Sequence, residues 1–168
     1  MTEYLKFAKD IAIKAGKIVM DYYNSNEDIQ LKYKRDNSIV TLADIESEKL
    51  IRDAIKNEFP DHSIISEEKG ILKKKDSYYI WCIDPLDGTT NFSIHYPFFS
   101  ISIALFKEYT PIMGVIYFPP QNELFYAEEN SGAYLNNKKI NVSSEDNLKH
   151  AIIAFSNNLE ELNVRLLS

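Results

Sequence analysis

The chain has 168 residues, of which 45% are hydrophobic and 26% are charged, as expected for one globular domain with a sizeable core over residues 1–168. Its net charge of −6 at pH 7 gives no support to a broad nucleic-acid-binding surface. The longest nearly apolar run, residues 97–106, is too short to cross a bilayer, and charges from Glu3 onward do not fit a signal peptide. We therefore expect a cytoplasmic protein that binds neither membranes nor nucleic acids.

The N-terminal region predicts two amphipathic helices. Apolar residues recur at helical spacing from Tyr4 to Tyr22, and a short strand is predicted over Ile29 to Lys34. Thr41 and Asp44 then stand in the spacing of a capping box, before a second periodic run that extends to Phe59. Local sequence alone favours a structural role for Asp44, as a first-turn carboxylate stabilised by the helix dipole.

A short strand at Ile64 and Ile65 is predicted to lead into the adjacent carboxylates of Glu67 and Glu68. Because neighbouring residues on a strand point to opposite faces, we expect only one of the two carboxylates to reach a shared site.

The stretch WCIDPLDGTTNF, residues 81–92, joins the end of a predicted strand, a tight turn and a helix start at Thr89 or Thr90. Asp84 and Asp87 supply two carboxylates, which are the oxygen ligands that hard divalent cations prefer. A helix N-terminus beside them offers backbone N–H groups to a phosphate. The same DPLDG turn also satisfies ordinary turn preferences, so taken alone it is more typical of a structural turn than of a catalytic one.

The second half of the chain predicts a meandering antiparallel sheet. Ser100, Ser102 and Ala104 would share a face small enough for close helix packing, while larger apolar residues occupy the other face. The single cysteine, Cys82, is interpreted as a small buried residue. The expected strands are residues 98–106, 112–118, 124–127, 133–135, 138–142 and 151–155. A hairpin turn is expected at residues 136–137, between the fourth and fifth of these strands. A helical pattern follows the last strand, to residue 167.

Three stretches resemble the signatures of the inositol monophosphatase family of Mg²⁺-dependent phosphatases: residues 36–44 (DNSIVTLAD), residues 66–68 (SEE) and residues 81–92. The second departs mildly from the family pattern, because Ser66 stands where the family usually has glycine. The resemblance implies an α+β fold in which N-terminal helices pack on an antiparallel meandering sheet. This would be the N-terminal half of the family's layered αβαβα fold.

The resemblance also implies a metal site. Glu67, Asp84 and the backbone carbonyl of Leu86 would bind one Mg²⁺, and Asp84 and Asp87 would share a second Mg²⁺. Carboxylates together with retained waters suit the all-oxygen octahedral preference of this ion.

Catalytic and substrate-binding roles follow from the same resemblance. A metal-activated water would attack phosphorus, and its proton would pass through the hydroxyl of Thr89 to Asp44. The substrate would lie against Asp87, Gly88, Thr89 and Thr90, with the backbone N–H groups of Gly88 and Thr89 holding its phosphate. We expect a small-molecule phosphomonoester as substrate and a homodimer as the assembly.

The expected activity is Mg²⁺-dependent hydrolysis of an inositol or sugar phosphate, with fructose 1,6-bisphosphate or adenosine 3′,5′-bisphosphate as alternative substrates. Family members are longer, and the aspartate of their C-terminal Trp-Asp motif has no counterpart after Phe92. We therefore expect this chain to correspond to an N-terminal part, with weak binding of the second cation and slow turnover.

Two other classes of function remain open. One is a truncated, non-catalytic protein that binds a metal or a partner through exposed apolar surface. The other is nucleic-acid binding through the basic residues at positions 32, 34, 35 and 73–75, which the overall charge disfavours. No role is assigned to His62, His95 or His150, which are widely spaced.

Overall fold

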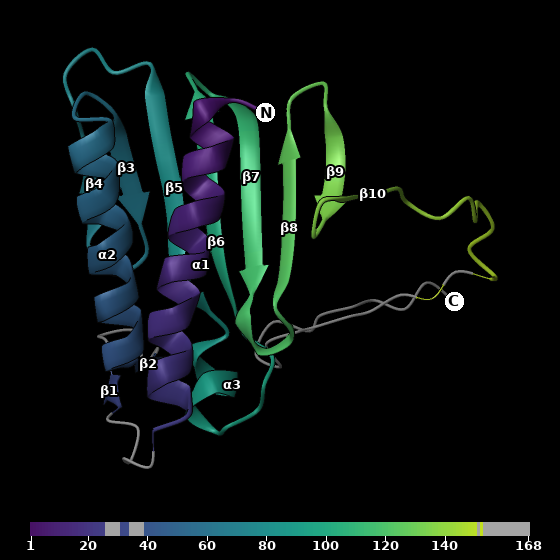
Figure 1. Cartoon of the computed structure of the whole chain (residues 1–168), viewed down its shortest axis with the longest axis horizontal. Helices are drawn as coiled ribbons and strands as arrows, with labels where there is room; N and C mark the ends of the chain where they lie inside the picture. The colour runs from purple at the N-terminus through teal and green to yellow at the C-terminus, as the bar shows by residue number, and fades with distance from the viewer. Residues whose placement is uncertain (26–30, 34–38, 151, 153–168) are drawn as a thin grey trace, which may run out of the picture.

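Two long helices cover one face of an eight-stranded sheet (Figure 1). The computed structural model describes residues 1–25, 31–33, 39–150 and 152. Helices α1 (Glu3–Tyr23) and α2 (Leu42–Glu58) lie side by side on the sheet. This arrangement confirms the predicted α+β fold with N-terminal helices packed on a sheet.

The sheet has the strand order β10-β9-β8-β7-β6-β5-β3-β4. Its neighbouring strands are antiparallel, as predicted, except for β3 and β5, which are parallel. The strands are β3 (Ser63–Ser66), β4 (Gly70–Leu72), β5 (Tyr79–Asp87), β6 (Ser100–Lys107), β7 (Thr110–Phe118), β8 (Glu123–Glu128), β9 (Gly132–Leu135) and β10 (Lys138–Ile140).

Shorter elements join these strands. The strands β1 (Lys32–Tyr33) and β2 (Ile39–Val40) pair with each other, and the short helix α3 (Thr89–Ser93) follows β5. A single 3₁₀ turn, η1 (Pro119–Gln121), connects β7 to β8. None of the described helices combines the length and apolar character needed to cross a bilayer.

The core lies between the two helices and one face of the sheet. The alternate residues Ile101, Ile103 and Leu105 of β6, and Phe99 just before it, are 2% exposed or less, so the predicted sharing of one face by these residues is confirmed. The expectation that helices pack on the opposite face was wrong for the described part of the chain. Both helices contact the face with the larger side chains, where more apolar area is removed from water.

An aromatic cluster closes one end of this core. Trp81 is fully buried, and its indole Nε1 donates a hydrogen bond to Nδ1 of His62 at 3.1 Å. The His62 ring stacks between Phe59 and Tyr79, with ring centroids 5.1 and 4.6 Å away. Burial lowers the pKa of His62. His62 is therefore a packing residue that accepts a hydrogen bond in its neutral form.

Other local predictions had mixed outcomes. Asn136 and Asn137 both have positive φ and turn the hairpin between β9 and β10, as predicted. Cys82 is only half-buried, because it points to the face of the sheet that the helices do not cover. Half of the strand predicted over residues 29–34 is described, and it contains β1 (Lys32–Tyr33). The other half, and nearly all of the elements predicted after residue 150, lie outside the described residues.

Close contact between α1 and the sheet depends on Gly16, and this generates a prediction. A Cβ atom at Gly16 would overlap the ring of Tyr117 and lie 3.1 Å from Cγ of Pro119. The overlap should cost more than the gain in helix propensity, so we expect Gly16→Ala to lower the free energy of unfolding by about 1–2 kcal/mol in urea titrations.

The matched control is Gly114→Ala on β7, where a Cβ atom would meet nothing within 4 Å. Its stability should stay within about 0.5 kcal/mol of the wild type. Equal effects of the two substitutions would contradict this account of helix packing.

Candidate active site

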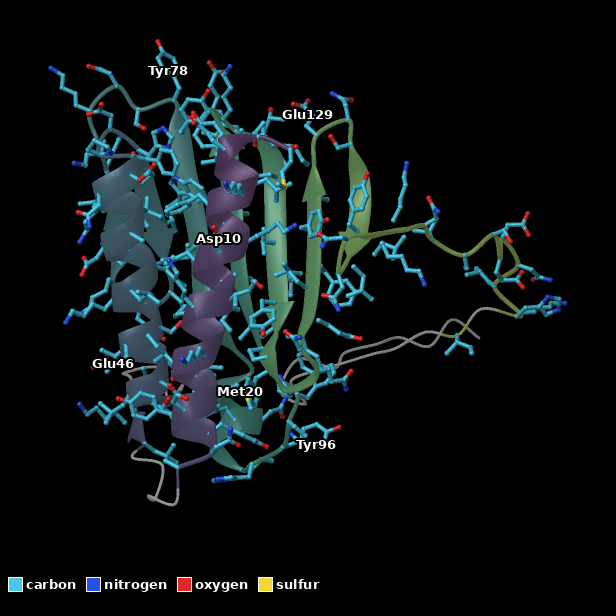
Figure 2. All side chains as sticks on the ribbon, in the orientation of Figure 1. Asp10, Met20, Glu46, Tyr78, Tyr96 and Glu129 are labelled. Atoms are coloured by element: carbon cyan, nitrogen blue, oxygen red, sulfur yellow. The ribbon has the colours of Figure 1, made fainter. Side chains whose placement is uncertain are left out.

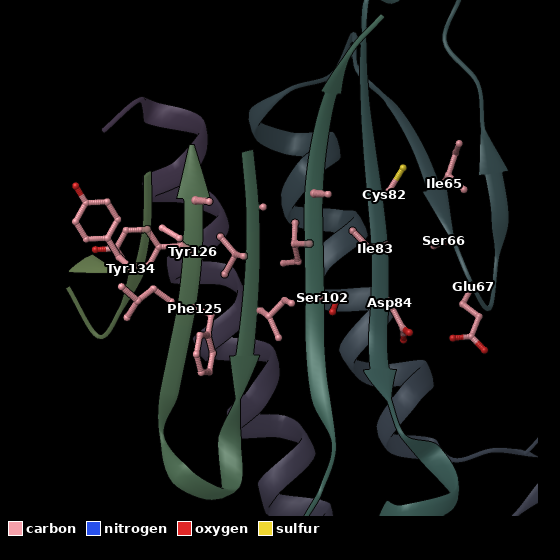
Figure 3. Close-up of a pocket in the computed structure, with 18 residues that line it drawn as sticks. Ile65, Ser66, Glu67, Cys82, Ile83, Asp84, Ser102, Phe125, Tyr126 and Tyr134 are labelled. Atoms are coloured by element: carbon pink, nitrogen blue, oxygen red, sulfur yellow. The ribbon is translucent and has the colours of Figure 1, made fainter. Parts of the chain in front are cut away.

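The parallel pairing of β3 with β5 brings two carboxylates together. Ser66 lies opposite Ile83, so the residues that follow them, Glu67 just after β3 and Asp84 within β5, lie next to each other. Figure 3 shows both side chains on the face that the helices leave open, and the negative charge of Glu67 acts on Asp84. The parallel register thus places two acidic side chains beside each other.

The environment of Asp84 disfavours its charged form. Burial, followed by the negative charges of Glu67 and Asp87, raises the pKa of Asp84 to about 7, although the Leu86 N–H donates a hydrogen bond to its Oδ1 at 3.2 Å. The site therefore carries more negative charge than its own hydrogen bonds stabilise. A bound cation would remove this imbalance.

A β-bulge separates Asp84 from Asp87. Asp84 pairs with Ser102 and Asp87 with Ser100, so β5 has one more residue than β6 over this interval. The bulge accommodates Pro85, which has no N–H for a sheet ladder. Without the extra residue, two side chains three positions apart would point to opposite faces; with it, Asp84 and Asp87 lie opposite Ser102 and Ser100, which share one face of the sheet.

Asp44 and Thr89 form a hydrogen-bonded pair on the helix-covered side. Asp44 is 1% exposed at the start of α2, where its Oδ2 accepts hydrogen bonds from the backbone N–H and hydroxyl of Thr41, at 2.8 and 2.5 Å. The predicted capping box is thus confirmed. Oδ1 of Asp44 lies 2.9 Å from the Thr89 hydroxyl, which is also 3.0 Å from the Leu86 carbonyl. Burial raises the pKa of Asp44 despite these hydrogen bonds.

Gly88 allows the chain to turn from β5 into α3. Its φ of 91° lies in the left-handed region, and a Cβ atom would come 2.9 Å from the carbonyl oxygen of Phe98. The helix begins at Thr89, as predicted, and its first-turn N–H groups have no acceptor within the helix. Thr90 is exposed on the outer side of this turn, where its carbonyl accepts hydrogen bonds from Ser93 and Ile94.

Two cavities flank the bulge and share Ile116 and Phe125 in their walls. One, of about 640 Å³, runs over the open face of the sheet and has Glu67 and Asp84 at one end (Figure 3). The other, of about 660 Å³, is lined by Asp87 and Gly88. The first cavity is mainly apolar, so the groups in it that could bind a cation are the carboxylates at its end.

The donor set fits a hard cation that keeps several waters. Among the described residues, no three carboxylate, imidazole or thiol groups are close enough to enclose a metal by themselves. Mg²⁺ commonly takes only one or two carboxylates, with waters and phosphate oxygens completing its shell. Glu67, Asp84 and the Leu86 carbonyl are oxygen donors of this kind.

Our reading of the sequence missed a polar stripe on the buried side of α2. Ser47 and Glu48 are both 0% exposed, and the Ser47 hydroxyl donates to the Pro85 carbonyl at 2.8 Å. Together with Asp44 they continue the helical spacing of the buried Ile51. The available signal was that polar residues occupy positions where the helical period predicts apolar ones.

Comparisons with known proteins find relatives that match most of this chain. The Nus factor SuhB of Pasteurella multocida is 40% identical over 153 residues, which span 91% of this chain and 57% of that protein. A fructose-1,6-bisphosphatase/inositol-1-monophosphatase of Aquifex aeolicus is 34% identical over 155 residues, which span 92% of this chain and 58% of that protein. This chain thus spans under two thirds of the length of these relatives.

Solved structures also match most of this chain. The crystal structure of the extragenic suppressor protein SuhB from Bartonella henselae matches with a TM-score of 0.82 at 35% identity, covering 86% of this chain and 56% of that one. An IMPase/NADP phosphatase complexed with Mg²⁺ and phosphate matches with a TM-score of 0.64 at 26% identity, covering 78% of this chain and 48% of that one. A model of the inositol monophosphatase family matches residues 1–162, and the chain therefore belongs to the inositol monophosphatase family.

Proposed function

We propose that this chain carries the metal-binding and water-activating part of a Mg²⁺-dependent phosphomonoesterase. The observation that carries the proposal is the double role of Leu86. Its N–H donates to Asp84, beside Glu67, and its carbonyl lies 3.0 Å from the Thr89 hydroxyl that is bonded to Asp44. One residue thus links the cation-binding carboxylates to a proton-accepting pair.

In this proposal Glu67, Asp84 and the Leu86 carbonyl bind one Mg²⁺, and Asp84 and Asp87 contribute to a second. Bound Mg²⁺ would supply a water of lowered pKa and would neutralise charge on the phosphate. Support comes from the crowding that raises the pKa of Asp84, and from the related IMPase/NADP phosphatase described with Mg²⁺ and phosphate.

The protein's own contribution is proton transfer and orientation. The Thr89 hydroxyl would accept the proton of the attacking water while passing its own proton to Oδ1 of Asp44, the atom it already faces at 2.9 Å. Oδ2 of Asp44 is held by Thr41, so the carboxylate cannot rotate away from Thr89. Burial raises the pKa of Asp44, which makes this carboxylate a stronger base than an exposed aspartate.

The proposed phosphate position is the start of α3. The backbone N–H groups of Gly88 and Thr89, with the side chains of Asp87 and Thr90 beside them, would hold the phosphate and the adjoining part of the substrate. The names of the relatives support an inositol phosphate or a fructose bisphosphate as substrate.

A second candidate is a non-catalytic role in binding a partner. It is favoured by the apolar cavity on the open sheet face and by the relatives named Nus factor. Mn²⁺ binding by a folded chain that releases no phosphate would favour this candidate.

The proposed activity predicts phosphate release from myo-inositol 1-phosphate that depends on both Mg²⁺ and Asp84. Asp84→Asn removes a charge without changing the size of the side chain, so we expect kcat/KM to fall at least about 100-fold in a phosphate-release assay. Asp10→Asn, at an exposed position on α1, is the matched control and should keep the wild-type rate (Figure 2). Equal release by both variants would mean that the site lies elsewhere.

The pKa of Asp84 also predicts how stability depends on pH without metal. An unfolded aspartate has a pKa of about 3.9, whereas the folded value here is about 7, so between these values the folded state holds a proton that the unfolded state releases. Stability should therefore fall as pH rises from about 4 to about 7, by on the order of 1–3 kcal/mol from this group.

Thermal unfolding in EDTA across this pH range tests the point. Asp84→Asn should flatten the decline and unfold at a higher temperature than the wild type at pH 8, whereas Asp10→Asn should keep the wild-type slope. An unchanged slope in Asp84→Asn would show that other groups cause the pH dependence.

A further inference from the structure

We propose that Glu48 and Arg52 of α2 are positioning residues that hold the β3–β4 turn, and with it Glu67, in place for cation binding. This inference rests on the proposed function, because Glu67 is a proposed cation ligand. Neither Glu48 nor Arg52 lines the cavity at that ligand, so their effect would pass through the turn.

The contacts surround the acidic residues of the turn. Oε1 of Glu48 accepts a hydrogen bond from the backbone N–H of Lys69 at 2.9 Å. Nη1 of Arg52 donates to the Ser66 hydroxyl at 2.5 Å and to the Gly70 carbonyl at 3.2 Å. The segment that contains Glu67 is therefore attached to one helix before, within and after its bend.

Burial makes this attachment rigid. The Glu48 side chain is 0% exposed and that of Arg52 is 11% exposed, with 3.8 Å between Oε1 and Nη1. Oε2 of Glu48 has no hydrogen-bond partner among the described residues. A buried and incompletely satisfied ion pair is often no more stabilising than a well-packed apolar pair. Stability alone therefore does not explain this pair, whereas its directional contacts to the turn do.

The turn needs such an attachment because Glu67 and Asp84 carry the same charge and lie next to each other. An exposed turn without it could relieve the repulsion by moving away from β5. The same side of α2 also holds β5 itself, through the hydrogen bond from Ser47 to the Pro85 carbonyl. One helix thus fixes both segments that supply cation ligands.

The test compares Glu48→Ala, Glu48→Gln and Arg52→Gln in the 168-residue chain. Glu46→Ala is the matched control, because Glu46 is exposed on the same helix (Figure 2). Mn²⁺ affinity is measured by electron paramagnetic resonance, and backbone hydrogen exchange is measured on the metal-free protein. We expect Glu48→Ala to weaken Mn²⁺ binding by about 10-fold or more and to speed exchange of residues 67–70, with β5 and β6 unchanged.

The conservative variant separates positioning from general destabilisation. Glu48→Gln keeps an oxygen that can accept the Lys69 N–H, so its Mn²⁺ affinity should return to within about 3-fold of the wild type. The proposal is overturned if Glu48→Ala binds Mn²⁺ like Glu46→Ala, if Gln is as damaging as Ala, or if exchange rises throughout the sheet. If Glu48→Ala does not fold, the proposal is tested instead by the Mn²⁺ affinity and the hydrogen exchange of Arg52→Gln.

Glu67→Gln distinguishes this failure from a failure of the proposed function. Weaker Mn²⁺ binding by Glu67→Gln, together with normal binding by Glu48→Ala, would reject only the positioning role. Unchanged binding by Glu67→Gln would reject the cation site itself, and the positioning role with it.

Discussion

The candidate site depends on the parallel pairing of β3 with β5 within a sheet whose other described pairs are antiparallel. Parallel strands run in the same direction, so the residues that follow the paired Ser66 and Ile83 lie side by side. An antiparallel pairing would have placed Glu67 and Asp84 at opposite ends of the strands. The start of α2 lies at the end of β5 (Figure 1), which brings Asp44 into reach of Thr89.

Asp44 and Asp84 lie close in the fold but have different surroundings. Both are buried enough for the pKa to rise. Asp44 accepts hydrogen bonds from Thr41 and Thr89, which partly offset the cost of burial. Asp84 instead faces the negative charge of Glu67, with one backbone N–H as a donor. The first environment suits a carboxylate that accepts a proton, and the second suits one that binds a cation.

Much of the fold was predictable because its causes are local. The helical spacing over α1, the capping box from Thr41 to Asp44 and the alternation along β6 each depend on residues close together in sequence. The parallel β3–β5 pair was not predictable in this way, because it joins segments across a crossover. The preference for Glu67 over Glu68 came from family resemblance. The separate strand argument, that only one of the two carboxylates can reach the site, does not apply, because β3 ends at Ser66 and both carboxylates lie in the following turn.

The buried polar residues of α2 show a further limit of periodicity. A helical period identifies which positions face the core, and Ser47 and Glu48 do face it. It does not tell whether the partner surface is apolar or made of backbone groups that need hydrogen bonds. Here the partners are the Pro85 carbonyl and the Lys69 N–H, at a bulge and a turn whose backbone groups are not paired in the sheet ladder. Irregular backbone beside the site thus explains polar residues in a core helix.

The open face of the sheet adds an electrostatic consequence. Small residues such as Ser102, Ala104 and Gly114 line its cavity, and Glu67 and Asp84 stand at one end of it. The wall beside the carboxylates is therefore mainly apolar and offers few dipoles to stabilise their charge. Wherever polypeptide or ligand excludes water from such a wall, the effective dielectric falls and the attraction between carboxylate and cation grows. The lower dielectric also raises the free-energy cost of a charged Asp84 that has no cation beside it. Binding of a cation and exclusion of water from this face should therefore favour each other.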